Sequence, residues 1–331
     1  MLRSMYTGIS GMSGFQNKLD VVSNNISNVN TFGFKKGRQT FSDLMSQTTQ
    51  GATGPVGDGQ LGGRNPMQVG LGSSTGSIDN IHTQGNRQTT NRPLDLAIEG
   101  DGMFVVAERS WSAENLDEVA NDLHDDDFDD LNDDEQSSVL NFISLEEDNV
   151  SYTRAGNFYL DDDGYIVNDD GEYLVGNYAE NENAVNDEDL TDDTGRIRIP
   201  EGAQSFSVGG DGTVNFVDEE GQSRIAGQIM LANFSNPEGL EKAGGNNFNL
   251  TNNAGLMGLD EDGDPDGDVG YLFAPGEGGT GNVFAGALEM SNVDLAEEFT
   301  EMITSQRGFQ ANTRVITTSD EILQELVNLK R

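Results

Sequence analysis

The sequence predicts an α+β protein whose two ends form paired, coiled-coil-like helices and whose middle is a mainly antiparallel β-domain with acidic insertions. Apolar residues recur at helical spacing near both termini, and short β-branched and aromatic runs separated by Asp-Gly pairs fill the middle. Two stretches, 108–149 and 256–270, are rich in Asp or Glu. These patterns divide the 331 residues into segments 1–45, 46–92, 93–285 and 286–331.

The N-terminal helix is predicted from apolar residues that recur every three or four positions. Positions three and four apart are neighbours on a helix surface, so these residues form one apolar seam. The seam consists of Met5, Ile9, Met12, Phe15, Leu19, Val22, Ile26 and Val29. The Asn-rich stretch from Asn28 to Gly33 indicates the end of this helix, because Asn and Gly favour left-handed and turn conformations.

The C-terminal helix is predicted from Asp294 to Arg331, with Asp294 as its N-cap and Glu297 completing a capping box. Two rows at seven-residue spacing share one face. The first is wholly apolar and the second is mixed: Leu295, Met302, Phe309, Ile316 and Leu323, then Phe299, Gln306, Thr313, Asp320 and Val327. The polar members weaken a closed two-helix core, and they suit a surface that faces water or neighbouring subunits. The alternative is that each helix packs separately on the central domain.

Residues 46–92 contain many Gly, Ser, Thr, Asn and Gln and little apolar periodicity, which predicts an extended linker with one or two short strands. Residues 93–285 show strand patterns, and Asp163-Gly164 and Asp170-Gly171 are typical of hairpin turns. Further strands are expected over 196–200, 205–208, 213–217 and 226–234. A central antiparallel β-domain follows, with Ile197, Ile199, Phe206, Val208, Val214 and Phe216 expected in its core.

Charge excludes several classes of partner. The formal net charge is -40, with 58 acidic against 18 basic residues, and phosphate binding requires clustered Lys and Arg. Nucleic acid and anionic membrane surfaces are therefore excluded as partners. Sixteen acidic residues lie from Glu108 to Asp148 against only Arg109. A disordered acidic protein, a calcium binder and a protein adapted to brine would all fit; we favour the last, because concentrated salt screens such charge.

Little chemistry is indicated. Asp262, Asp264 and Asp266 match the first positions of a calcium loop, but the twelfth position is Phe273 where a bidentate Glu is needed, so a solvated loop is the better interpretation. There are two histidines and no cysteine, which predicts no enzyme, no cofactor and no disulfide. No cleavable secretory signal is evident, and no apolar run approaches the ~20 residues that span a bilayer.

Several sequence blocks resemble the signatures of bacterial flagellar rod and hook proteins, and they occur in the family's order. The blocks are residues 24–36 (NNISNVNTFGFKK), 95–104 (DLAIEGDGMF), 152–158 (YTRAGNF), 286–295 (GALEMSNVDL), 305–312 (SQRGFQAN) and 317–323 (TTSDEIL). The ending at residues 326–331 (LVNLKR) is more similar to hook than to rod proteins.

The resemblance implies a hook subunit that self-assembles into a hollow, flexible tube joining rod to filament. Its terminal helices would form the inner tube and its β-domain the outer layer. Expected partners are further copies of the chain, the rod, hook–filament junction and hook cap proteins, and the type III export apparatus. That apparatus would deliver the chain to the flagellum outside the cell without a cleaved signal peptide. The assembly residues would be the two helix seams together with Asn24, Asn25, Asn28, Gly33 and Phe34. The alternatives are a distal rod protein and, from another class, a secreted calcium-dependent adhesion module.

Overall fold

The computed structural model describes residues 2–54, 62–108, 149–179, 190–200, 202–255, 257 and 271–329, and these form two compact units. Unit 1 contains residues 1–29, 35–81 and 293–331, and unit 2 contains residues 30–34 and 82–292. Each unit is therefore built from segments far apart in the sequence. The predicted segments differ from this division, because residues 46–81, predicted as part of a separate linker, belong with the terminal helices.

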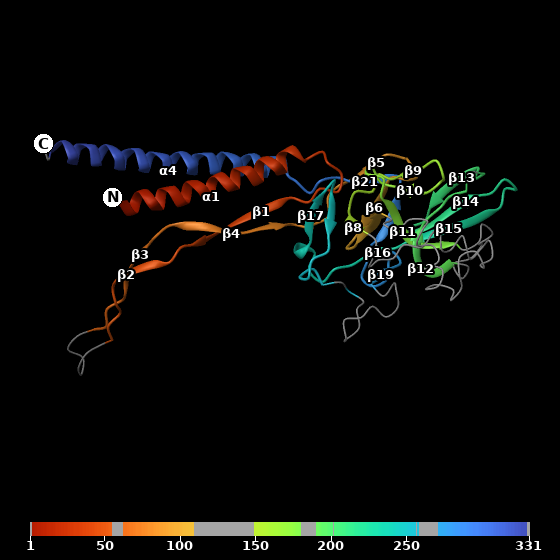
Figure 1. The fold of residues 1–331 in the computed structure, drawn as a ribbon, viewed down its shortest axis with the longest axis horizontal. Helices are drawn as coiled ribbons and strands as arrows, with labels where there is room; N and C mark the ends of the chain where they lie inside the picture. The colour runs from red at the N-terminus through yellow and green to blue at the C-terminus, as the bar shows by residue number, and fades with distance from the viewer. Residues whose placement is uncertain are drawn as a thin grey trace, which may run out of the picture. The chain divides into compact units, whose positions relative to one another are not determined.

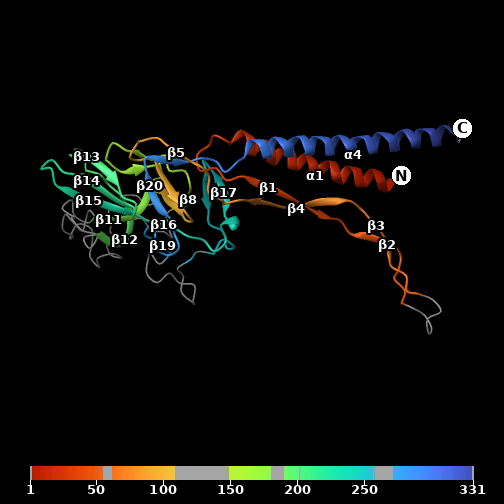
Figure 2. The same cartoon turned by 180° about the vertical axis from the view of Figure 1, so that it is seen from behind.

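Unit 1 is a pair of long helices accompanied by narrow β-ribbons. Figures 1 and 2 show α1 (Leu2–Ser27) and α4 (Leu295–Leu329) side by side. Strand β1 (Gly37–Asp43) pairs antiparallel with β4 (Ser73–Asn80), and β2 (Ser46–Gln50) pairs with β3 (Met67–Gly70). A helix at each end of an α+β chain confirms the broad fold prediction.

The start of α4 follows the predicted cap. Asp294 Oδ1 accepts hydrogen bonds from the backbone N–H groups of Ala296 at 2.8 Å and Glu297 at 3.4 Å. These bonds satisfy two of the donors that a helix N-terminus leaves unpaired. The Glu297 side chain contacts Lys36 at 3.0 Å.

The described part of the stretch predicted as a linker with one or two short strands contains four: β2, β3, β4 and β5 (Arg87–Thr89). The sequence signal was weak because β2 and β3 are exposed along their whole length, so their side chains do not alternate between apolar and polar. Backbone pairing and cross-strand hydroxyl contacts, such as Thr40 with Ser77 at 2.8 Å, hold these ribbons.

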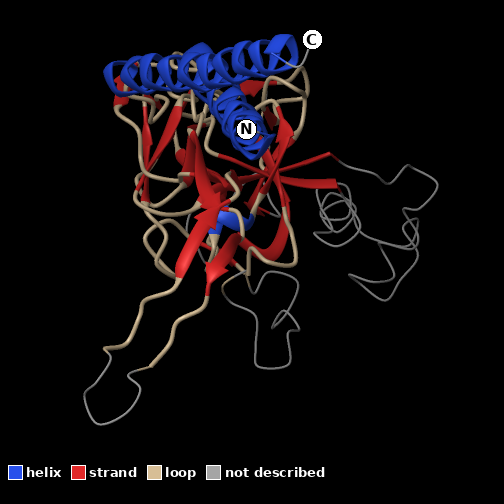
Figure 3. Ribbon diagram, turned by 90° about the vertical axis from the view of Figure 1, so that its left-hand side faces the viewer, coloured by secondary structure: helices blue, strands red, loops and turns tan. Residues whose placement is uncertain are grey.

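The described residues of unit 2 form short strands and one 3-10 turn, η4 (Pro237–Gly239). Figure 3 shows its strands in red. Thirteen strands form one sheet with the central order β13-β14-β15-β11-β7-β8-β18-β17, and neighbouring strands of this sheet pair antiparallel. Two smaller sheets pair β5 with β21 and β6 with β20. The remaining strands are β6 (Leu96–Glu99), β7 (Met103–Glu108), β8 (Asn149–Thr153), β9 (Tyr159–Leu160), β10 (Ile166–Val167), β11 (Tyr173–Ala179), β12 (Leu190–Arg196), β13 (Ser205–Val208), β14 (Thr213–Val217), β15 (Ser223–Ile229), β16 (Leu231–Ala232), β17 (Glu241–Gly244), β18 (Asn247–Asn249), β19 (Leu272–Phe273), β20 (Asn282–Ala285) and β21 (Ala287–Glu289).

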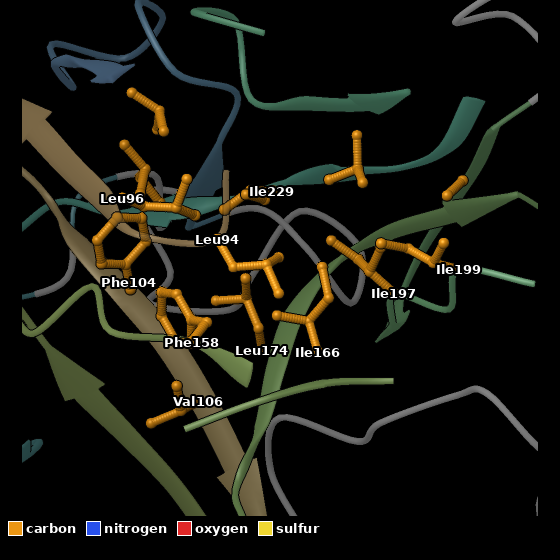
Figure 4. Close-up of a cluster of buried hydrophobic side chains, with 14 of the residues drawn as sticks. Leu94, Leu96, Phe104, Val106, Phe158, Ile166, Leu174, Ile197, Ile199 and Ile229 are labelled. Carbon is orange, nitrogen blue, oxygen red and sulfur yellow. The ribbon is translucent and has the colours of Figure 1, made fainter. Parts of the chain in front are cut away.

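Two apolar clusters form the core of unit 2. Figure 4 shows the first, in which Phe104 and Phe158 meet edge to face with ring centroids 5.4 Å apart. Of the six predicted core residues, four are buried in this first cluster: Ile197, Ile199, Val214 and Phe216. Phe206 and Val208 are partly buried and pack against this cluster. They belong to β13, which lies at the edge of the sheet and has a neighbour on one side only.

The predicted Asp-Gly turns are present. Gly164 and Gly171 have φ values of 85° and 86°, which glycine adopts without steric penalty. Of the residues in the strand expected over 196–200, only Arg196 lies in a strand, as the last residue of β12 (Leu190–Arg196), and Arg198 forms an isolated bridge with Tyr165. The predicted acidic insert, apart from Glu108 and Asn149 at its ends, lies outside the described residues, as do Asp262, Asp264 and Asp266.

Candidate functional site

The packing of α1 on α4 is antiparallel and depends on small residues. A Cβ atom added at Gly8 would lie 3.2 Å from Ile316 Cγ1, and one added at Gly308 would lie 2.6 Å from the Phe15 ring. At the far end of α1, Asn25 meets Glu298 near the start of α4. Each glycine makes room for an apolar side chain of the facing helix, Ile316 at Gly8 and Phe15 at Gly308, so these side chains pack directly on the partner's backbone.

A buried polar joint fixes the end of α1 against the start of α4. Asn25 Nδ2 donates to Glu298 Oε2 at 3.1 Å and to the Gly37 carbonyl at 2.8 Å, and the Gly37 N–H donates back to Asn25 Oδ1 at 2.9 Å. Lys36 Nζ lies 4.0 Å from Glu298 Oε1. Burial raises the pKa of Glu298, which the hydrogen bond from Asn25 and the charge of Lys36 partly offset.

The predicted α1 seam is only partly covered within the chain. Val22 and Asn25 are buried, while Ile9 and Asn24 are exposed. The other predicted residues of α1 and the stretch after it are half-buried: Met5, Met12, Phe15, Leu19, Ile26, Asn28 and Val29. Burial within one chain therefore accounts for part of this apolar surface and leaves Ile9 outside.

The two predicted rows of α4 differ in burial. In the first row Met302, Phe309, Ile316 and Leu323 are half-buried and Leu295 is exposed. The second row is exposed throughout: Phe299, Gln306, Thr313, Asp320 and Val327. The most buried positions of α4 form a third row that sequence reasoning missed, Glu298, Ser305 and Ser319, with Asn312 half-buried between them. Its seven-residue spacing was visible, but its polar composition concealed it.

In unit 2, four of the sequence blocks that resemble flagellar signatures meet at one point. We call this point the motif junction, and it consists of one residue from each block: Gly33, Gly100, Arg154 and Glu289. Arg154 Nη1 lies 3.2 Å from Glu289 Oε2, and the two side chains are 5% and 0% exposed. Arg154 Nη2 donates to the Gly100 carbonyl at 2.7 Å, and the Gly33 N–H donates to the Glu289 carbonyl at 2.9 Å. A buried ion pair with these extra hydrogen bonds ties together chain segments as much as 256 residues apart in sequence.

The predicted residues Gly33 and Phe34 lie at this junction. Gly33 has φ of 69°, and an added Cβ would lie 2.5 Å from the Ala155 nitrogen, so no side chain fits. Lys242 Nζ lies 4.6 Å from the centre of the buried Phe34 ring, and burial lowers the pKa of Lys242. Arg154 and Glu289 were not among the predicted site residues. The sequence signal that could have found them is a charged residue inside each of two family-like blocks, residues 152–158 and 286–295.

Charge divides sharply between the units. Unit 1 holds 11 acidic and 10 basic residues, a net charge of -1, so unit 2 carries -39 of the total -40. Among the described residues no group of three or more His, Asp or Glu could hold a metal ion. Within the same residues no helix is long and apolar enough to cross a membrane.

Comparison with known proteins assigns the family. The model "Flagella basal body rod protein" matches residues 5–35, "Flagellar hook protein FlgE/F/G D1 domain" matches 142–216, and "Flagellar basal body rod FlgEFG protein C-terminal" matches 285–329. The flagellar basal-body rod protein FlgG of Bacillus subtilis (strain 168) is 46% identical over 331 residues, covering all of both chains. The chain belongs to the flagellar rod and hook protein family.

Other relatives include both kinds of axial protein. The rod protein FlgG of Caulobacter vibrioides is 33% identical over 99% of this chain and all of its own, and the hook protein FlgE of Borreliella burgdorferi is 30% identical over all of both chains. This chain is thus a structural protein of the flagellar axis. The relatives are named as parts of the flagellum rather than as enzymes. The predicted hook assignment is not confirmed.

Proposed function

We propose that this chain is a rod subunit of the flagellar basal body, self-assembling with copies of itself into a tube. The observation that carries the proposal is the 46% identity to a rod protein over the full length of both chains. The hook relatives are 30% and 27% identical, in alignments of 466 and 479 positions against 331 residues here. Aligning with those hook proteins therefore requires long insertions in them, which the rod relative does not require.

The helical unit supports an assembling role. Leu295, Phe299 and Ile303 follow one another at four-residue spacing on α4 and are 40%, 49% and 51% exposed, and a group of neighbouring exposed apolar side chains is typical of a surface covered by a partner. Their role would be packing against neighbouring subunits, which is also the role that we propose for the two helix seams. Other axial proteins, including the hook, would be neighbours in the flagellum, and the type III export apparatus would deliver the chain.

A hook subunit is the second candidate, because the final residues resemble hook proteins and a hook relative also matches the whole chain. Electron microscopy of basal bodies labelled with an antibody to this chain separates the two, because label on the rigid rod supports the proposal and label on the curved hook overturns it. A calcium-dependent adhesion module has no support from the family.

Self-assembly is tested with purified protein. The full chain, concentrated in molar salt, should form tubes visible by electron microscopy. A chain lacking residues 295–331 should keep the circular dichroism of its β-domain but form none. Tubes formed by the truncated chain, or a full chain that stays monomeric at every concentration and salt condition, would contradict the proposal.

A further inference from the structure

The outer face of α4 carries four exposed charged residues. Arg307, Arg314, Glu321 and Glu325 are exposed, and none forms an ion pair within the part of the chain that the structure describes. Other charges on the same helix do find partners. Glu301 lies 3.2 Å from Lys18, and Glu297 lies 3.0 Å from Lys36. We call the four unpaired residues the charged stripe.

The charged stripe faces away from α1. At about 100° per residue, its four members fall within roughly 40° of one another around the helix. Ser305 and Ser319, which are buried, lie about 160° and 120° from Arg307. Small exposed residues, Ala311 and Thr318, lie between the charged positions, so a second helix can approach this face closely.

The stripe is bipolar along its length. Both arginines precede both glutamates, and the centres of the two pairs are about 12 residues apart, roughly 19 Å along the helix axis. A parallel copy displaced by about 12–14 residues would therefore place its own arginines beside these glutamates. Complementary charges of this kind fix the register of a contact more than its strength.

We propose that the charged stripe is the contact between two copies of this chain packed in parallel and displaced by about 12–14 residues, with Arg307 and Arg314 of one copy facing Glu321 and Glu325 of the next. This inference rests on the proposed function, because a subunit of an axis with two different ends must repeat in one direction. A head-to-tail contact also continues into a filament, whereas a two-fold antiparallel contact closes as a dimer.

Charge reversal tests the pairing. The variants Arg307→Glu/Arg314→Glu and Glu321→Lys/Glu325→Lys should each raise the protein concentration needed for tubes by about tenfold or more. An equal mixture of the two should assemble near the wild-type concentration. The fourfold variant, which keeps the net charge of -40, should assemble alone. All chains are compared at one ionic strength, because unit 2 carries -39, and circular dichroism verifies that each variant is helical.

Cross-linking tests the direction and displacement. The chain has no cysteine, so a variant with Thr304→Cys and Thr318→Cys reports only the new thiols. In the parallel arrangement residue 304 of one copy lies beside residue 318 of the next, and oxidation gives a ladder of covalent multimers. Antiparallel pairing brings the two copies of residue 318 together and stops at covalent dimers, which would overturn the inference.

The two proposals fail differently. If every charge variant forms tubes at the wild-type concentration, the charged stripe is not the contact, while the rod assignment stands. If the wild-type chain forms no tubes under any condition, the proposed function and this inference fall together.

Discussion

Breaking the buried ion pair of the motif junction by removing one partner is expected to destabilise unit 2 strongly. In the variant Glu289→Gln the amide oxygen can still accept the Gly85 N–H, which donates to Glu289 Oε1 at 2.8 Å in the wild type. Arg154 would lose its carboxylate partner at 3.2 Å while remaining 5% exposed. The variant therefore isolates the loss of charge compensation from the loss of the other hydrogen bond.

The magnitude follows from burial. Removing one partner of a buried ion pair destabilises a protein by about 3–5 kcal/mol, because the other charge stays buried without compensation. The matched control is Glu99→Gln, which breaks the pair of Arg87 with Glu99, also 3.2 Å long but with side chains 37% and 49% exposed. An exposed pair contributes about 0–1 kcal/mol. The two variants make the same chemical change at the same separation and differ in burial.

Urea unfolding of the full chain measures the difference. Six of the seven tyrosines belong to unit 2, so near-ultraviolet circular dichroism follows its unfolding. In a separate thermal unfolding experiment, a loss of about 3–5 kcal/mol in a unit of this size should lower the melting temperature of Glu289→Gln by about 6–20 °C. The double variant Arg154→Met/Glu289→Met should recover part of the loss, since it leaves no buried charge. Free energies of unfolding within about 1 kcal/mol of each other for Glu289→Gln and Glu99→Gln would refute the reasoning.

Two further predictions concern single positions. Gly33→Ala should destabilise unit 2 by well over the ~1–2 kcal/mol that a left-handed alanine costs, because its Cβ would meet the Arg154–Ala155 backbone. The control Gly171→Ala, at a φ of 86° with nothing within 4 Å of the added Cβ, should cost only that amount. Equal losses of unfolding free energy for the two variants in chemical denaturation would show that crowding at Gly33 is unimportant. Burial raises the pKa of Glu298 above its ordinary 4.5, so the charged carboxylate is disfavoured in the folded state. As the pH rises from 4.5 through the raised pKa, the free energy of unfolding of unit 1 in the wild type should therefore fall relative to that of Glu298→Gln. Helical circular dichroism during thermal melting measures this second effect, with Asn25, Lys36, Glu297 and Glu301 kept unchanged, and parallel pH profiles of the two chains would contradict it.

Local patterns were sufficient where the structure depends on near neighbours in sequence. Asp294 caps α4 because its side chain reaches backbone N–H groups only two and three residues away. Gly164 and Gly171 close hairpins because only their own backbone must adopt a positive φ. Strands β13 and β14 match their predicted bounds, because apolar residues alternate with polar ones along them and the Gly-rich turn at residues 209–212 separates them.

The face that α4 turns toward α1 could not be read from the sequence. Rows at seven-residue spacing lie side by side around a helix, and the most apolar row was the natural prediction for the contact. The structure instead buries Glu298, Ser305 and Ser319 most deeply, while Gly8 and Gly308 make room for the larger side chains of Ile316 and Phe15. Apolar residues such as Phe299 are thereby left exposed.

The sequence by itself determined the flagellar family, the two terminal helices and the antiparallel character of the middle, because each rests on motifs or periodicities within short stretches. Only the tertiary structure decided that residues 46–81 join the terminal helices, and that Gly33, Gly100, Arg154 and Glu289 meet. These are contacts between distant segments. Their geometry depends on how the whole chain packs, and no local pattern encodes it.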